Sequence, residues 1–447
     1  MTREEVVVAG VRTAVGDFGG SLKDFSPTQL GAMVVKEVVA RAGVSADQVG
    51  HVVFGHVVNS EPRDMYLSRV AAIEGGLDKS TPALTLNRLC GSGLQAIVTA
   101  AQSIMLGDAD VAIGGGAESM SKAPYILPAA RWGARMGDMK GIDMMVGALH
   151  DPFHVIHMGV TAENVAKEFN VSREDQDALA VESHKRAANA IANGYFKEQI
   201  LPIEIKSKKG PVMFDTDEHV RGDATVEGMA KLKTVFQKDG TVTAGNASGL
   251  NDGAGAVLLM ERSAAEKAGK KPMARLVAYA NTGVEPTIMG IGPVSATKKA
   301  LAKAGLSKLL ASIPPSAAPA PTMVWISSRK RITSPWACLT SSITDLSRSS
   351  NSPRNLEPAT SPPMSRANTR RFFSELGTSP ATMREASPSA MAVLPTPASP
   401  MMTGLFFFRR LNVCITCRIS SSRPTTGSSL PSRASLVRSM VYFSKER

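Results

Sequence analysis

The chain has 447 residues, which is enough for two or three packed domains. Hydrophobic residues make up 43% of it and charged residues 20%, which is close to the usage of ordinary soluble globular proteins, and no apolar run approaches the ~20 residues of a membrane span. The N-terminus has no basic stretch followed by an apolar core, so we expect a cytoplasmic protein that enters no membrane.

The first part of the chain alternates between strand-like and helix-like segments. Glu5–Val11 and Val49–Val58 are rich in β-branched residues and predict strands. Helical spacing marks Pro27–Gly43, which ends at a glycine, and Gly91–Leu106. The short apolar run Asp110–Gly114 follows the second helix. This alternation predicts an α/β fold around a largely parallel or mixed sheet.

Residues 119–245 have a different character, because Met, His, Gly and charged residues dominate and helices such as Ser172–Asn193 alternate with long loops. We interpret them as a loop-rich insertion over the sheet. The alternation then resumes with two strands and a helix, at Ala254–Met260, Ala274–Tyr279 and Ser295–Ala304. The predicted boundaries are a first half at 1–118, a loop domain at 119–246, a partial second half at 247–307 and a tail at 308–447.

The tail differs from the rest in proline content and charge. It holds 16 of the 27 prolines but 3 of the 38 glycines, and proline interrupts both helices and central strands. Its 18 Lys and Arg against 5 Asp and Glu give a net charge of +13, which accounts for the +12 of the whole chain. We expect a disordered tail without helices or strands. Its arginines lie among Ser and Pro with few aromatics, so we expect no specific binding of nucleic acid.

Four cysteines are present, and only Cys90 precedes the tail. A single cysteine in the body argues for a reducing compartment and against a disulfide framework. Cys414 and Cys417 lack the further ligands of a zinc site, so we attribute their spacing to chance and predict no metal site.

The strongest local motif is Asn-Arg-Leu-Cys-Gly-Ser-Gly-Leu-Gln-Ala at residues 87–96. Ala83–Leu86 resembles a strand, and the glycines after Cys90 open a helix. Cys90 would then stand at a helix N-terminus, where the partial positive charge favours the thiolate and N–H groups could hold an oxyanion. A buried cysteine that packs as a small hydrophobic side chain fits the local sequence equally well.

Three further motifs are weaker. In residues 157–164 a His-Met pair precedes a helix for which Thr161 is the expected N-cap, and either a pocket lining or a surface histidine fits. Residues 246–257 predict Gly-Asn-Asp turns that lead into a strand, either beside a ligand or as a glycine-rich hairpin. Gly114–Met120 predicts a tight exit from a strand and no dinucleotide site, since no GxGxxG opens a helix there.

In this order and at these separations, the motifs resemble the thiolases, the family of acetyl-CoA acetyltransferases and β-ketothiolases. The resemblance runs from Arg3 to about Leu306 and looks closest to the bacterial β-ketothiolases of the biosynthetic branch that supply polyester storage granules. Besides the cysteine motif it rests on segments 11–24, 114–125, 148–166, 217–236 and 243–256.

The resemblance implies two similar βαβαβαββ halves with a loop domain inserted in the first, the second half being truncated here. It implies that Cys90 carries an acyl group as a thioester during the Claisen condensation of acyl-CoA and its reverse, thiolysis. It also implies a homotetramer that uses coenzyme A thioesters as substrates and needs no metal or redox cofactor. The residues that would line the coenzyme A site are Leu149, His157, Met158, Arg221, Phe236, Ala244, Ser248 and Met289.

The sequence departs from the family after Ala304-Gly-Leu306. The family's Asn-Glu-Ala-Phe loop, Gly-His-Pro motif and Cys-x-Gly motif are missing, and His219 is the last histidine. Claisen chemistry needs a base for Cys90, a second base for the α-proton, and donors for the oxyanions. We therefore predict a thiolase-like chain without turnover, produced by a frameshift, a fusion or a gene-model error. The alternatives are a non-catalytic CoA-binding remnant with a basic tail and an enzyme completed by a partner chain.

Overall fold

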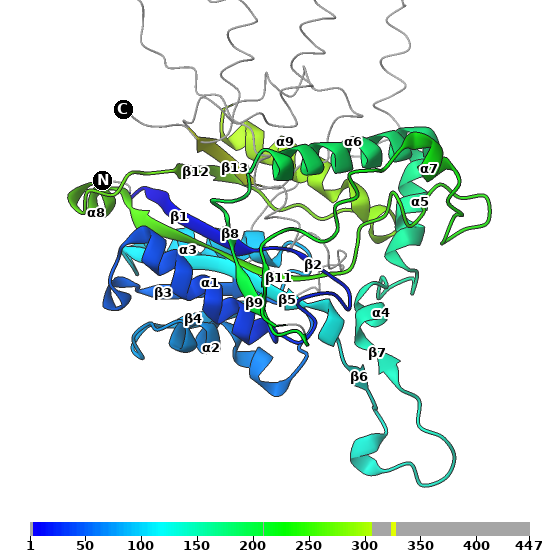
Figure 1. The fold of residues 1–447 in the computed structure, drawn as a ribbon, viewed down its shortest axis with the longest axis horizontal. Helices are drawn as coiled ribbons and strands as arrows, with labels where there is room; N and C mark the ends of the chain where they lie inside the picture. Colours follow the sequence, from blue (N-terminus) through cyan, green and yellow to red (C-terminus); the bar gives the residue numbers. More distant parts are fainter. Residues whose placement is uncertain (1–2, 209, 306–322, 328–447) are drawn as a thin grey trace, which may run out of the picture. The chain divides into compact units, whose positions relative to one another are not determined.

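The computed structural model describes residues 3–208, 210–305 and 323–327 (Figure 1). Within these ranges the strands are β1 Glu5–Thr13, β2 Gly16–Asp17, β3 His51–Gly55, β4 Ala83–Leu86, β5 Val111–Ser119, β6 Tyr125–Ile126, β7 Ile142–Asp143, β8 Ile200–Leu201, β9 Ile203–Ile205, β10 Val212–Phe214, β11 Asn251–Glu261, β12 Ala274–Tyr279 and β13 Met323–Ser327.

The same ranges contain the α-helices α1 Pro27–Ala42, α2 Leu67–Glu74, α3 Ser92–Leu106, α4 Met144–Ala148, α5 Met158–Glu168, α6 Arg173–Ala192, α7 Val226–Ala230, α8 Arg262–Lys267 and α9 Gly292–Lys303. Short 3₁₀ helices are η1 Ala46–Gln48, η2 Pro62–Tyr66, η3 Met120–Lys122, η4 Ala130–Trp132 and η5 Pro286–Ile291.

One mixed sheet organises the described residues, with the strand order β13-β12-β1-β11-β5-β3-β4. β5, β3 and β4 run parallel to one another, whereas β11 is antiparallel to both β5 and β1. β2 adds to β11, and β8 pairs with β1 in parallel, so a strand from the predicted insertion joins this sheet. The α/β class predicted from the alternation is confirmed.

The two faces of the sheet bury different hydrophobic clusters. Along β1, Val6 belongs to the cluster that α1 completes, while its neighbour Val7 belongs to the cluster that α3 completes. This is the alternation of side chains expected of a strand covered on both sides. α3 contributes Ala96, Ile97, Ala100, Ala101 and Ile104 to its cluster. By length and composition alone the segment Leu89–Leu106 could cross a membrane, so the expectation that no apolar run approaches a span is wrong for these 18 residues. The packing of α3 against the sheet accounts for their apolar character.

Glycines at the sheet surface let α3 approach closely. A Cβ at Gly114 would lie 2.6 Å from the Ile97 Cα, and one at Gly55 would lie 2.6 Å from the Gly93 nitrogen. The prediction that Gly114–Met120 forms an exit from a strand is wrong, because the glycines lie inside β5. A glycine there removes the side chain that would hold the helix away.

Helix boundaries agree with the prediction where the capping residues are close to the helix end in the sequence. α1 begins after Ser26, whose hydroxyl accepts the Gln29 N–H in a capping box, and ends at Gly43 with φ 60°. The predicted helices at 172–193 and 295–304 correspond to α6 and α9. The strand predicted at Val49–Val58 is shorter in the structure, where only β3, His51–Gly55, is extended.

Buried polar contacts hold the residues after β7 to the main sheet and to one another. The Arg12 guanidinium on β1 donates to the Asp217 carboxylate at 2.8 Å, and both side chains are buried. Glu163 on α5 is also buried and accepts the consecutive N–H groups of Thr241 and Val242, at 2.9 and 2.8 Å. The insertion therefore holds defined helices, and its predicted boundaries at 119 and 246 stay predictions.

Most of the predicted tail lies outside the described residues, as do Cys338, Cys414 and Cys417. The exception is β13, whose backbone pairs antiparallel with β12. The prediction that the tail contains no strand is therefore wrong for 323–327. This run, Met-Val-Trp-Ile-Ser, lacks proline and has strand propensity, and it pairs with a sheet edge.

Candidate active site

Three parallel strands end side by side, and the residues that follow them form the surroundings of Cys90. β3 ends at Gly55 and β4 ends at Leu86, and the register pairs these two residues. Gly55 also pairs with Gly116 near the end of β5. Ligand and catalytic sites of α/β sheets form at such carboxyl ends of strands.

Side chains of the turn itself hold Cys90 before α3. The Asn87 carboxamide oxygen accepts the Leu89 N–H at 2.8 Å, and the Ser92 hydroxyl accepts the Arg88 N–H at 2.8 Å and donates to the Leu89 carbonyl at 2.5 Å. Leu89 adopts φ 47°, in the left-handed region that non-glycine residues rarely enter. These contacts hold Cys90 in a strained turn, as is common at functional sites.

Cys90 immediately precedes Gly91, the N-cap of α3. The predicted position at a helix N-terminus is therefore confirmed. The first N–H groups are already used, since Gly91 donates to the Arg88 carbonyl and Ser92 to the Leu89 carbonyl, at 3.0 and 2.9 Å. The prediction that the leading N–H groups of this helix could hold an oxyanion does not apply to these two donors.

The Cys90 thiol is buried, with 1% of the residue exposed, in a small apolar cluster with Val58 and Met120. Leu149, one of the predicted site residues, packs against the same cluster. The backbone N–H of Met158 donates to the Leu149 carbonyl at 2.8 Å. Three predicted site residues therefore form one continuous region.

His157 and Phe236 form a second pair of predicted site residues. Their rings stack with centroids 4.7 Å apart, and His150 meets the His157 ring edge-on at 5.2 Å. Burial lowers the pKa of His157, and the neighbouring His150 lowers it further. A neutral ring agrees with the hydrogen bond in which His157 Nδ1 accepts the Gly159 N–H at 3.0 Å.

This hydrogen bond makes His157 the N-cap of α5. The prediction that Thr161 caps the helix is wrong, because Thr161 lies in the first turn and its hydroxyl donates to the Met158 carbonyl. A histidine nitrogen can accept a backbone N–H as a serine or threonine oxygen does, which the usual N-cap preferences do not include.

Met289 lies on η5, which packs against α5. The Asn164 side chain on α5 donates to the Thr287 carbonyl at 2.9 Å and fixes this contact. Met289 is half-buried. The structure therefore places it beside the helix that begins at Met158.

Arg221, Ala244 and Ser248 are exposed. The Arg221 guanidinium lies 3.2 Å from the Asp17 carboxylate, which also receives His219 Nδ1 at 2.7 Å. We call Asp17, His219 and Arg221 the Arg221 corner. The His219 ring occupies the space that a side chain at Gly249 would need, so this corner also contacts the loop that carries Ser248. Sequence reasoning missed Asp17 and His219, although both lie in segments that resemble the family, 11–24 and 217–236.

The predicted Gly-Asn-Asp turns are wrong, because Asn251, Asp252 and Gly253 open β11. The Asn251 side chain donates to the Gly16 carbonyl at 3.0 Å, and Asp252 accepts the Ser121 hydroxyl at 2.5 Å. Both residues are buried. Small polar residues that suggest a turn are here the buried start of a strand.

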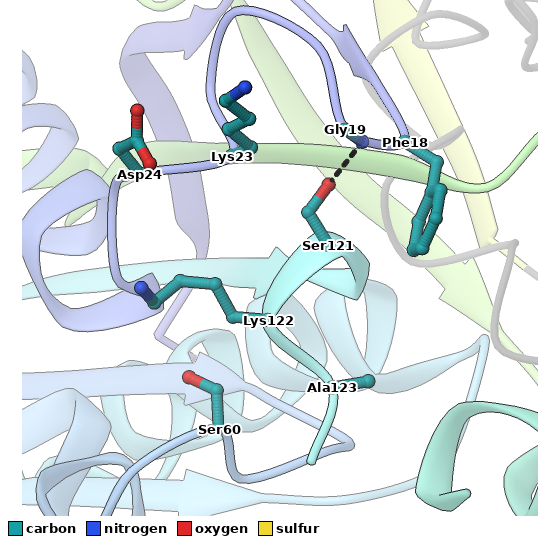
Figure 2. A pocket seen from close by; sticks show the side chains of 8 residues that line it. All are labelled: Phe18, Gly19, Lys23, Asp24, Ser60, Ser121, Lys122 and Ala123. Carbon is teal, nitrogen blue, oxygen red and sulfur yellow. Dashed lines mark hydrogen bonds between the residues drawn. The ribbon is translucent and has the colours of Figure 1, made fainter.

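A separate groove of about 520 Å³ opens near the start of β11 (Figure 2). Ser121 lies at its centre and accepts the Gly19 N–H at 2.8 Å. None of the predicted site residues lines it, but Ala123 belongs both to its wall and to the surroundings of the Cys90 cluster. The lining residues are Phe18, Gly19, Lys23, Asp24, Ser60, Ser121, Lys122 and Ala123.

Comparison with known families agrees with this arrangement. The family described as thiolase, N-terminal domain, matches residues 5–263, and thiolase, C-terminal domain, matches residues 270–313. The chain belongs to the thiolase family. Its second-half match is short and ends near the predicted point of departure.

Relatives of this thiolase match the same part of the chain. The β-ketothiolase BktB of Cupriavidus necator is 69% identical over 307 residues, which cover 68% of this chain and 78% of the relative. An acetyl-CoA acetyltransferase of Syntrophomonas wolfei is 51% identical over 310 residues, or 69% of this chain and 78% of the relative. Both names are those of acyltransferases, so an acyltransferase function is supported for the matched part.

Solved structures extend the likeness to the fold. The crystal structure of human mitochondrial 3-ketoacyl-CoA thiolase in complex with CoA is similar with a TM-score of 0.66 and 44% identity, over 68% of this chain and 76% of that chain. The Bacillus anthracis acetyl-CoA acetyltransferase has the same TM-score and identity, over 68% and 77%. The predicted thiolase fold is confirmed for the matched part of the chain.

Proposed function

We propose that Cys90 is the acyl-accepting nucleophile of a thiolase-type reaction. Its sulfur attacks the carbonyl carbon of an acyl-CoA, a new carbon–sulfur bond forms, and the bond to coenzyme A breaks. The thiol proton passes to the departing coenzyme A thiolate, so the exchange is balanced. The single observation that supports this role best is the position of a buried thiol next to the N-cap of α3, in an apolar cluster that Leu149 shares.

We further propose that this chain stops at the acyl-enzyme. Carbon–carbon bond formation requires a base at the α-carbon and donors for the enolate oxygen. The histidine and second cysteine that the family uses lie in motifs missing after residue 306. Groups that act as a unit lose most of the rate enhancement when one of them is absent.

Two measurements test the proposal. Acetyl-CoA should acetylate Cys90 in a single turnover, detected by mass spectrometry of the peptide, and Cys90→Ser should abolish the signal. Steady-state thiolysis of acetoacetyl-CoA should be at least about a thousandfold slower than for a complete thiolase assayed alongside. Turnover near that of the complete enzyme would refute the second part, and an unmodified Cys90 would refute the first.

A second candidate function is binding of coenzyme A without chemistry. The stacked His157–Phe236 pair, Met289 and the exposed Arg221 could hold the pantetheine and nucleotide parts. CoA titration at two salt concentrations, with and without DNA, separates this function from charge-driven binding by the basic tail, which should weaken steeply with salt. CoA affinity that persists in Cys90→Ser, together with no acetylation of Cys90 in the unsubstituted chain, would favour this candidate.

We also propose a cytoplasmic location and, by analogy with the family, a homotetramer. A reducing compartment suits a thiol nucleophile. Light scattering of the purified chain tests the assembly, and fractionation of the producing cell tests the location.

A further inference from the structure

Three buried ionisable side chains lie behind the Cys90 turn, and the proposed acyl transfer does not use them. His56 directly follows β3, Glu118 is near the end of β5, and Asp64 lies in η2. All three are at most 5% exposed. Buried charges are costly unless hydrogen bonds and partners hold them, so such a cluster needs a reason.

Glu118 binds the backbone of the residues that follow β3. Its two carboxylate oxygens accept the consecutive N–H groups of Val57 and Val58, at 2.9 and 3.2 Å. His56 Nδ1 lies 3.0 Å from the Ala117 carbonyl and 3.3 Å from Glu118. Because both of these neighbours are acceptors, Nδ1 carries the proton.

Asp64 holds the next part of the same segment. Its Oδ2 accepts the Ser60 N–H and hydroxyl at 2.7 and 2.6 Å, and the Glu61 N–H at 3.0 Å. The same oxygen lies 3.9 Å from His56 Nε2. Residues 56–61, which we name the strap, are therefore held at both ends by buried carboxylates.

The strap is linked to the Cys90 turn in two ways. Val58 is one of the buried residues that enclose Cys90. The Val57 carbonyl accepts the Asn87 side-chain N–H at 3.3 Å, and the same Asn87 side chain accepts the N–H of Leu89, the strained residue before Cys90. Hydrogen bonds thus run from Glu118 through Val57 and Asn87 to the Cys90 turn.

We propose that Glu118 is a positioning residue that, through the strap and Asn87, keeps the Cys90 sulfur at the amino end of α3. This inference rests on the proposed role of Cys90. Glu118 is 28 residues from Cys90 in sequence and needs no contact with substrate. The positive end of a helix lowers the pH at which a nearby thiol ionises, and this effect is confined to the first turn. A turn that relaxes would therefore lose it.

The groups that face Glu118 are His56 and Asp64, together with the N–H groups of the strap. Burial raises the pKa of the Glu118 carboxyl above its usual value and Asp64 adds to this rise, whereas His56 and the strap N–H groups offset only part of it. In a glutamine at this position, the carboxamide NH₂ would face either the Val57 or the Val58 N–H. Glu118→Gln therefore breaks one of the two strap bonds while keeping size and shape.

The test measures the rate of iodoacetamide alkylation at Cys90 against pH, by mass spectrometry of the Cys90 peptide in the full chain. In Glu118→Gln the midpoint of the alkylation profile should rise by about one pH unit. Loss of a nearby negative charge by itself would lower the midpoint. Better hydration of the loosened thiol would also lower the midpoint, and better access would raise the plateau rate. A rise in the midpoint is therefore the signature of lost positioning.

Three further variants complete the design. Asn87→Ala, at an exposed position, should fold and raise the midpoint in the same direction, and the double variant should shift it no further than the larger single effect. Glu163→Gln is the matched control, because Glu163 is equally buried and also accepts two consecutive N–H groups. It should leave the midpoint unchanged.

The outcomes are distinguishable from those of the proposed function. A wild-type Cys90 that acetyl-CoA does not acetylate overturns its role as a nucleophile, and this inference with it. A reactive wild-type Cys90 whose midpoint does not rise in Glu118→Gln or Asn87→Ala overturns this inference alone. If Glu118→Gln does not fold, Asn87→Ala decides the question.

Discussion

The Cys90 turn and the Arg221 corner, which consists of Asp17, His219 and Arg221, belong to one proposed site. They differ in how far their charged groups are exposed to solvent. Next to the Cys90 turn, His56, Asp64 and Glu118 are buried, and the two carboxylates receive backbone N–H groups. At the Arg221 corner the Asp17 and Arg221 side chains are 28% and 56% exposed. Buried groups act through geometry and resist salt, whereas exposed charges act at a distance and are screened by it.

The largest effect should come from the buried ion pair between Arg12 and Asp217. Asp217→Asn leaves the Arg12 guanidinium buried without a carboxylate, which costs about 3–5 kcal/mol. Urea unfolding measures the loss. Glu37→Gln, which breaks an exposed pair with Arg41, is the control and should cost less than about 1 kcal/mol. Equal losses in the two variants would contradict the division into buried and exposed charges.

The next largest effect on stability concerns Glu5, whose buried carboxyl lies on β1. Burial is the main cause that raises its pKa from 4.5 to about 7. The folded state therefore binds this proton more tightly than the unfolded state, and its contribution to stability is lost as pH rises from about 4.5 to about 7. Glu5→Gln should match the wild type at pH 4 and be more stable by about 2–3 kcal/mol at pH 8. A difference that does not change with pH would refute this titration.

A smaller effect should follow from adding a methyl group between β3 and α3. Gly55→Ala would place a Cβ 2.6 Å from the Gly93 nitrogen and should cost about 1–3 kcal/mol. Gly10→Ala is the control, because the nearest atom to its Cβ is a Val257 methyl carbon at 3.5 Å, an ordinary contact. Thermal unfolding of both variants gives the comparison, and similar melting temperatures would show that α3 can move away without cost.

The smallest effect on stability should come from Asp17→Asn at the Arg221 corner. The partly exposed ion pairs with Arg221 and His219 should contribute less than about 1 kcal/mol, and the contribution should shrink at high salt. CoA titration of the same variant reports whether an unpaired Arg221 binds the anionic ligand more tightly. A large loss of stability that persists in 1 M salt, where the screening length is about 3 Å, would break the comparison.

Much of the fold was predictable because its signals are local. The capping box at Ser26 and the left-handed Gly43 mark the two ends of α1 in the sequence. The glycines of 114–116 and residues Asn251–Gly253 were misassigned for one reason. Small and polar residues favour turns in isolation, but here they lie in strands where a helix packs closely or a buried side chain bonds a distant carbonyl.

The sequence by itself determined that Cys90 precedes a helix, that the positive charge gathers in the last third, and that the thiolase motifs end near residue 306. Each of these depends on residues close together in the chain. Only the tertiary structure joined Glu118 to Val57, 61 residues apart, and His219 to Asp17, 202 residues apart. It also decided which carboxyls are buried, and hence the raised pKa of Glu5. Burial and long-range hydrogen bonds depend on how the strands are ordered in the sheet, and that order is not a local property of the sequence.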